Sequence, residues 1–176
     1  GNVRDVMCMG AEVIACTNSF RFGEINNNKT KWIHDGVVAG IAGYGNPLGI
    51  PNIGGDIYYH EGYNENCLVT LVTLGIVRED HLIHSYAPEN ADGYDLILIG
   101  KPTDNSGFGG ASFASLELEE EKKEQNKGAV QEPNAFLERH LLKSTYALFE
   151  ILKERSLINQ VGFKDLGAGG VACASV

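Results

Sequence analysis

Several kinds of residue and pattern are scarce in this chain, and each scarcity excludes a class of protein. The four cysteines show no Cys-x-x-Cys spacing, so neither a zinc site nor a disulfide framework is expected. No apolar run approaches the roughly 20 residues that span a bilayer. Lysine and arginine number 14 against 23 acidic residues, which argues against nucleic acid or an anionic membrane as the main partner. We expect a cytoplasmic protein with reduced thiols.

Glycine is the residue present in excess. The chain has 22 glycines in 176 residues, gathered at 36–62, 107–110 and 167–170, so specific loops require them. A hydrophobic content of 43% allows a core, and the length fits one medium domain or two small ones. The chain starts at Gly1 rather than Met, and we interpret it as a piece of a longer protein.

The first ninety residues are predicted to mix helices and strands. Apolar spacing predicts helices over 2–9 and 31–44, with Asn2 capping the first and Asn46-Pro47 ending the second. The second helix contains three glycines, which weaken it, so a neighbour is expected to pack closely on that face. Strands are predicted over 11–20, 51–59, 68–77 and, more weakly, 82–86.

A turn-rich break near Ala91 is expected to separate two domains, 1–90 and 91–176. In the second domain we predict strands over 94–99 and 161–165 and a long helix over 134–155. Asn134 can cap this helix. Its apolar stripe is expected to comprise Phe136, Leu137, Leu141, Leu148, Ile151 and Leu152. The charged run at 117–127 is expected to be solvated.

Two carboxylates and their neighbours are candidates for a site. Asp165 ends an apolar run just before a glycine-rich turn, which fits either a metal–phosphate corner or tight packing. Asp5 lies in the first turn of a predicted helix, where it either complements the helix dipole or holds Mg²⁺. Arg4 beside it could grip a phosphate or carboxylate with two nitrogens. Gln131 precedes the long helix and fits a substrate carbonyl or a cap equally well.

Two glycine-containing segments stay ambiguous from the residues alone. The segment 107–115 offers consecutive N–H groups and two hydroxyls, but it matches neither a P-loop nor a dinucleotide fingerprint. Gly54 and Gly55 lie inside a predicted strand, where glycine marks a bulge or a close approach by another group. The five histidines share no metal-ligand spacing, and none is assigned to catalysis.

Five motifs, in this order, resemble one known family. They are "GNVRDVMCMGAEVIA", "NSFRFG", "GVVAGIAGYGNPLGIPNIGGDIYY", "GGASFASLEL" and "VGFKDLGAGGVACAS". The chain resembles phosphoribosylformylglycinamidine synthase (synthase II subunit) of the aminoimidazole ribonucleotide synthetase superfamily over its whole length. The resemblance implies an α+β to α/β fold, in which a mixed-sheet domain backed by helices is followed by the start of a second α/β domain.

The resemblance also implies an activity. The family is an ATP-dependent ligase of purine biosynthesis that converts formylglycinamide ribonucleotide to its amidine, with ammonia delivered from glutamine by a partner glutaminase. It implies that Arg4 and Gln131 bind substrate and that Asp5 and Asp165 are ligands of Mg²⁺. Two departures stand out: Asp56 replaces the usual Glu, and 132–136 replaces a Gly-Asp-Pro-Phe-like run.

Several of the family's parts are expected to lie outside this chain. The family's catalytic histidine would precede Gly1, and a second copy of the two-domain unit, with most of the ATP site, would follow Val176. We therefore expect these residues alone to be inactive, and an uncovered sheet face to pair with a second copy. Alternatives are a small-molecule kinase or dikinase of the same superfamily, or a non-catalytic nucleotide-binding module that docks a glutaminase.

Overall fold

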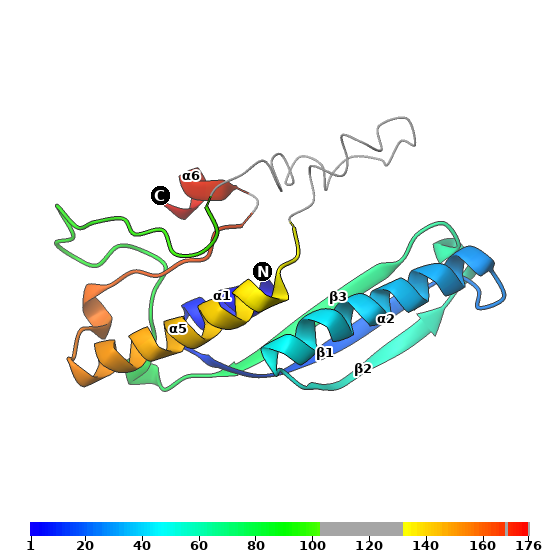
Figure 1. Cartoon of the computed structure of the whole chain (residues 1–176), viewed down its shortest axis with the longest axis horizontal. Coiled ribbons are helices and arrows are strands. Elements are labelled where there is room, and N and C mark those ends of the chain that lie inside the picture. Colours follow the sequence, from blue (N-terminus) through cyan, green and yellow to red (C-terminus); the bar gives the residue numbers. More distant parts are fainter. Residues whose placement is uncertain (103–131, 168, 176) are drawn as a thin grey trace.

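The computed structural model describes residues 1–102, 132–167 and 169–175. The predictions for 107–115, 117–127 and Gln131 lie outside the described residues. In chain order the helices and strands are α1 (Asn2–Cys8), β1 (Glu12–Phe22), α2 (Asn28–Leu48), β2 (Asn52–Tyr59), β3 (Leu68–Ile76), α5 (Ala135–Glu154) and α6 (Gly170–Ala174), with short 3-10 turns η1 (Glu61–Tyr63), η2 (Glu79–His81) and η4 (Ile158–Gln160). Helix α2 runs along the sheet, and α1 lies beside α5 at one end (Figure 1).

The sheet is mixed, as predicted, with the order β2-β1-β3. Strand β1 is central, parallel to β2 and antiparallel to β3. Its register with β2 shifts between Cys16 and Thr17. Gly55 has a φ of 140°, and a Cβ there would collide with the backbone oxygen of Asn18. Gly55 therefore serves a close backbone approach beside this irregularity of the sheet, whereas a Cβ at Gly54 would meet no described atom within 4 Å.

Helix α1 confirms the first predicted helix, but its cap differs from the prediction. The N-cap is Gly1, and no side chain caps the helix. Asn2 instead lies inside the first turn, and its side-chain amide donates to the backbone oxygen of Leu71 on β3 at 3.3 Å. The helix ends before Gly10, whose φ of 83° is the left-handed conformation that glycine tolerates.

Helix α2 is longer at both ends than the predicted 31–44. The side chain of Asn27 caps it by accepting from two backbone N–H groups of the first turn. The prediction that Asn46-Pro47 ends the helix is wrong, because the helix continues through Pro47 to Leu48. It ends at Gly49, which adopts a left-handed φ of 69° and donates its N–H to the carbonyls of Gly45 and Asn46.

The glycines of α2 face open space. A Cβ built at Gly36, Gly40 or Gly43 would meet no atom within 4 Å among the described residues. The expectation of a closely packed neighbour on this face is therefore not met in the described part of the chain. The opposite side of α2 packs on the sheet, where His34 contacts the rings of Phe22 and Tyr59.

Three predicted strands, 82–86, 94–99 and 161–165, are not strands in the structure. A strand requires a neighbour with which to exchange backbone hydrogen bonds. Between 161–165 and 82–86 a single such bond forms, from Phe163 N to His84 O at 3.0 Å. Segment 94–99 has no paired strand among the described residues, and Leu96 is 86% exposed. The residues have the right composition for strands, but the described chain offers them no partner.

Helix α5 confirms the predicted long helix, and Asn134 caps it as predicted by accepting from Leu137 N at 2.9 Å. Its buried face differs from the predicted stripe. Phe136 is 76% exposed, and Ile151 is also exposed. The buried residues are Glu138, Leu142, Thr145, Phe149 and Leu152. Two polar residues thus occupy the inward face, and one of them, Glu138, leads to the candidate site.

Two hydrophobic clusters close the end of the molecule formed by α1 and α5. The first joins α1 to α2 and α5 through Val3, Met7, Cys8, Leu48 and Leu142. The second lies under the end of α5 and comprises Ile83, Phe149, Leu152 and Ile158. Phe163 packs against both clusters, so it ties the C-terminal segment to this closed end.

Candidate functional site

Helix α1 carries two of the predicted site residues side by side. Val3, Met7 and Cys8 anchor it in the first hydrophobic cluster. Arg4 and Asp5 lie between these anchors in the sequence, and their side chains leave the core: Arg4 is half-buried and Asp5 is exposed. The helix therefore fixes the backbone positions from which both charged side chains extend.

Asp165 reaches the same place from the other end of the chain. Its segment, 161–167, is held by the backbone bond from Phe163 to His84. The Phe163 ring also packs edge-on against Phe149 of α5, with ring centroids 5.2 Å apart. These contacts bring the Asp165 carboxylate to α1, although the two segments lie at opposite ends of the sequence.

Arg4 lies between two carboxylates. Its Nη1 donates to Oε2 of Glu138 at 3.0 Å, and its Nε lies 3.6 Å from Oδ2 of Asp165. All three side chains are largely buried. Burial alone would lower the pKa of Arg4, but the charge and hydrogen bond of Glu138 and the charge of Asp165 raise it overall. The guanidinium is therefore charged and held on two sides.

Asp5 and Asp165 form a pair of like charges. The pKa of Asp165 is raised, first by burial, then by a hydrogen bond to the Asp5 carboxyl and by its charge, while Arg4 opposes the shift. Two neighbouring carboxylates repel one another unless a proton or a cation lies between them. Their oxygens are ligands of the kind that Mg²⁺ prefers. No group of three or more His, Cys, Asp or Glu that could hold a metal occurs among the described residues.

A cavity of about 510 Å³ opens beside these residues. Arg4, Glu138 and Asp165 line it, together with Tyr44 of α2 and residues 97–102. Asp5 is exposed and is not part of the cavity wall. The structure thus brings Arg4, Asp5 and Asp165 together, while Gln131 lies outside the described residues.

Sequence reasoning missed two residues of this cavity. Glu138 is 5% exposed and lies among the buried positions of α5. An acidic residue at such a position is a signal that the sequence contains. Tyr44 projects from α2, and burial, then the charge of Glu138, raises its pKa, so its hydroxyl stays protonated. Tyr44 gives no such signal, because a tyrosine on an amphipathic helix fits a core position equally well.

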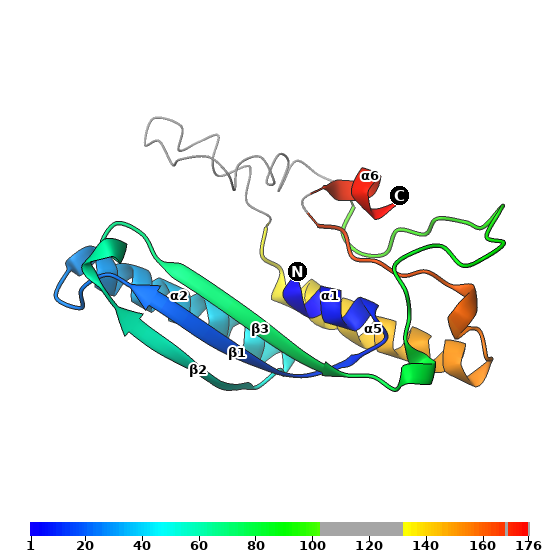
Figure 2. The ribbon, with the colours of Figure 1, turned by 180° about the vertical axis from the view of Figure 1, so that it is seen from behind.

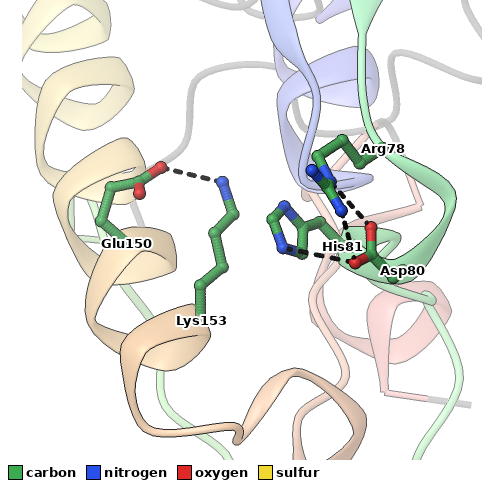
Figure 3. Close-up of polar contacts among 5 residues, drawn as sticks. All are labelled: Arg78, Asp80, His81, Glu150 and Lys153. Carbon is green, nitrogen blue, oxygen red and sulfur yellow. Dashed lines mark hydrogen bonds and ion pairs between the residues drawn. The ribbon is translucent and has the colours of Figure 1, made fainter.

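A second cavity, of about 370 Å³, lies between η2 and the end of α5. Its basic residues are already paired with nearby carboxylates on the same segment of chain (Figure 3). Arg78 binds Asp80 through two bonds of 3.0 Å, and Lys153 donates to Glu150 at 2.8 Å. Because each cation is neutralised locally and none of the predicted site residues is present, the first cavity is the candidate functional site.

Comparison with known proteins agrees with the fold. A model described as AIR synthase related protein, N-terminal domain, matches residues 1–77, and the model of the corresponding C-terminal domain matches residues 91–176. The chain belongs to the family of AIR synthase related proteins. The resemblance found in the sequence motifs is thereby confirmed at the level of the family.

Curated relatives show which proteins of this family the chain is similar to. Phosphoribosylformylglycinamidine synthase subunit PurL of Methanothrix thermoacetophila is 49% identical over 180 residues, covering 99% of this chain and 23% of the relative. The protein of the same name from Thermus thermophilus is 43% identical over 171 residues, covering 97% of this chain and 22% of the relative. The chain thus spans about a quarter of the length of the curated relatives it matches.

Solved structures show the same likeness. T. maritima PurL complexed with FGAR superposes with a TM-score of 0.76 at 32% identity, covering 98% of this chain and 26% of that one. T. maritima PurL complexed with ATP gives 0.68 at 28% identity, covering 98% and 23%. The structure of PurLQS from T. maritima gives 0.63 at 26% identity, covering 98% and 24%. Among the described residues, no helix is long and apolar enough to cross a membrane.

Proposed function

We propose that this chain is part of an ATP-dependent ligase that forms formylglycinamidine ribonucleotide from formylglycinamide ribonucleotide, ATP and glutamine-derived ammonia. The observation that carries the proposal is the convergence of Arg4, Asp5 and Asp165, of which Arg4 and Asp165 line one cavity. These are the residues for which the family resemblance implies roles. The relatives named PurL, and the one described as complexed with FGAR, support the same reaction.

Asp5 and Asp165 are the proposed ligands of Mg²⁺. The fit rests on the raised pKa of Asp165 beside Asp5, since a divalent cation would relieve that repulsion. Two carboxylates suit Mg²⁺, which keeps several waters and binds substrate phosphates through the remaining positions. When bound, the cation would neutralise phosphate charge during phosphoryl transfer from ATP.

Arg4 and Gln131 are the proposed substrate-binding residues. The guanidinium of Arg4 lies at the cavity wall and can pair with an anionic group of the nucleotide. Gln131 would contribute a side-chain amide near the start of α5. ATP is the proposed second substrate, supported by the relative described as complexed with ATP.

We further propose a division into two domains near Ala91, 1–90 and 91–176. The separate family models for 1–77 and 91–176 support it.

A glutaminase is the proposed ammonia source, and the assembly named PurLQS supports a multi-subunit arrangement. Because purine biosynthesis supplies a cytoplasmic pool, we place the protein in the cytoplasm. We propose that residues 1–176, about a quarter of the relatives' length, carry part of the substrate and Mg²⁺ site and do not catalyse the reaction alone.

The outer face of the sheet is the proposed site of self-association. Figure 2 shows this face, opposite α2, with no helix over it. Its β3 row consists of Leu68, Val72, Leu74 and Ile76, all exposed. An apolar row of this kind is stabilised when a second copy covers it. We propose a homodimer of the 176-residue chain through this face.

The natural protein that contains this chain provides the test of the reaction. Purified protein would be supplied with formylglycinamide ribonucleotide, ATP, Mg²⁺ and ammonium, and amidine formation would be followed together with ADP release. Asp165→Asn and Arg4→Ala are expected to lower kcat/KM by at least about 100-fold, whereas Glu154→Gln on the exposed side of α5 leaves it unchanged. ADP release without amidine would favour a kinase instead, and no turnover by the wild type would reject the proposal.

A further inference from the structure

Glu138 is a buried acid in the first turn of a helix. The helix begins at the Asn134 cap, and the Glu138 N–H donates to the Asn134 backbone oxygen at 3.0 Å. Its side chain is 6% exposed, although Leu142, the next inward position of the helix, is apolar. A carboxylate placed in such a face is costly unless a cation pairs with it.

Arg4 is that cation. Among the described residues, the hydrogen bond from Arg4 Nη1 at 3.0 Å is the one hydrogen bond or ion pair of the Glu138 side chain. Arg4 also approaches Asp165, but its Nε is 3.6 Å from that carboxylate, beyond a good hydrogen bond. No described residue forms a hydrogen bond or ion pair with Nη2 of Arg4. Glu138 therefore fixes one edge of the guanidinium and leaves donors for another group.

Glu138 and Asp165 differ in what else they can bind. Asp165 lies beside Asp5, and the proposed function gives its oxygens to a cation. An Asp165 carboxylate engaged by a divalent cation attracts Arg4 less. Glu138 has no such second partner among the described residues, so its hold on Arg4 does not depend on whether a cation is bound.

We propose that Glu138 is a positioning residue for substrate binding, which holds the Arg4 guanidinium at the cavity wall and prevents it from folding onto Asp165. The proposal rests on the proposed function, since Arg4 is there the group that meets the substrate. Glu138 itself does not touch the substrate.

Equilibrium binding of formylglycinamide ribonucleotide to the natural protein tests this role. Glu138→Gln keeps the shape and an acceptor for Arg4 but removes the charge, and it is expected to weaken binding roughly tenfold, the loss for a hydrogen bond to a charged group. Glu154→Gln makes the same change on the exposed side of the same helix and serves as the matched control. It should bind within about twofold of the wild type.

A double-mutant cycle separates positioning from general damage to the fold. If Glu138 acts through Arg4, then Glu138→Gln has no further effect on affinity in an Arg4→Ala background. A tenfold loss that persists in that background would overturn the proposal. So would a Glu138→Gln affinity equal to that of Glu154→Gln.

A ligand-free measurement keeps the test independent of the proposed reaction. The Nη1–H protons of Arg4, which Glu138 accepts in the structure, should exchange with water several-fold faster in Glu138→Gln than in Glu154→Gln when followed by NMR, because they lose their charged acceptor. Unchanged exchange would overturn the positioning role. If the wild type fails to bind the nucleotide, or Arg4→Ala binds it equally well, the proposed function fails, and the exchange rates still decide the role of Glu138.

Discussion

Two arginine–carboxylate pairs lie in contrasting regions of the molecule. Arg4 and Glu138 meet at the closed end, where their side chains are 16% and 6% exposed. Arg21 and Asp56 meet on the outer face of the sheet, where the values are 28% and 59%. Both pairs have a nitrogen–oxygen distance of 3.0 Å. Distance alone does not distinguish them, so burial decides which pair the fold depends on.

The apolar residues of the two regions differ in the same way. At the closed end, α1, α5 and the C-terminal segment bury one another's side chains in two clusters. On the outer face, the β3 row stands exposed beside the Arg21–Asp56 pair. The closed end therefore buries these apolar side chains within the described chain and can hold a site with defined geometry. The outer face has an apolar row typical of a protein interior, but no described helix covers it.

The largest expected effect tests the closed end. Phe149 is 1% exposed, and Phe149→Ala should lower the free energy of unfolding by about 3–5 kcal/mol, because it removes a buried ring and leaves a cavity. Phe136→Ala on the same helix removes an exposed ring and should cost less than about 0.5 kcal/mol. Urea titrations of both variants give the comparison. Equal losses would mean that the α5 surface bearing Phe136 is covered in solution.

The next largest effect tests the outer face. If a second copy covers it, Val72→Glu places a charge in that interface and should weaken self-association of the 176-residue chain by about 100-fold. Phe136→Glu introduces the same charge at an exposed position on α5, away from the sheet, and should leave the association unchanged. Sedimentation equilibrium over a concentration series measures both. A wild-type chain that is monomeric at every concentration would contradict the proposed homodimer.

The closed end also shows what could be predicted from the sequence. Helix α1, the three sheet strands and helix α5 could be predicted from residue type and spacing, because each strand pairs, and each helix packs, with a neighbour present in the described chain. The Asn134 cap followed from its side chain and position. The proximity of Arg4, Asp5 and Asp165 came from the family resemblance, since no local pattern reports a contact between residues 160 positions apart.

The remaining differences have physical causes. The apolar run at 94–99 suits a strand but lacks a paired neighbour among the described residues. The stripe of α5 was misjudged because Phe136 and Ile151 were assumed to be buried, whereas Glu138 and Thr145 occupy the inward face. Hydrophobicity alone cannot show that a buried acid is preferred where an arginine approaches from another helix.

A pH series tests the acidic pair at the closed end. The pKa of Asp165 in the folded protein is raised, so its stabilising contribution is complete below the unfolded pKa of about 3.9 and is lost as pH rises through the folded value. Asp165→Asn should therefore remove a fall in stability that begins near pH 4 and ends once pH has risen through the folded pKa of Asp165. The thermal midpoint of the metal-free wild type minus that of the metal-free variant, taken at each pH, isolates this contribution.

Addition of Mg²⁺ should reverse the effect at neutral pH in the wild type but not in Asp165→Asn, since a bound cation stabilises the folded state. Asp92→Asn, at an exposed position, is the control for the loss of one acidic charge. If the midpoint of the wild type minus that of Asp165→Asn rose with pH, the sign would be wrong. Repulsion between Asp5 and Asp165 would then not explain the pH dependence.

The smallest expected effect belongs to the exposed pair. Hydrogen bonds from Arg21 and Ser19 lower the pKa of Asp56, so its contribution is present above the unfolded pKa and is lost as pH falls through the folded value. Because solvent and salt screen this pair, Asp56→Asn should shift the unfolding midpoint far less than Glu138→Gln, and less still at high ionic strength. Thermal melts at low and high salt measure the difference. If Asp56→Asn proves as costly as Glu138→Gln, the pair is buried in solution, which requires that another surface covers the outer face.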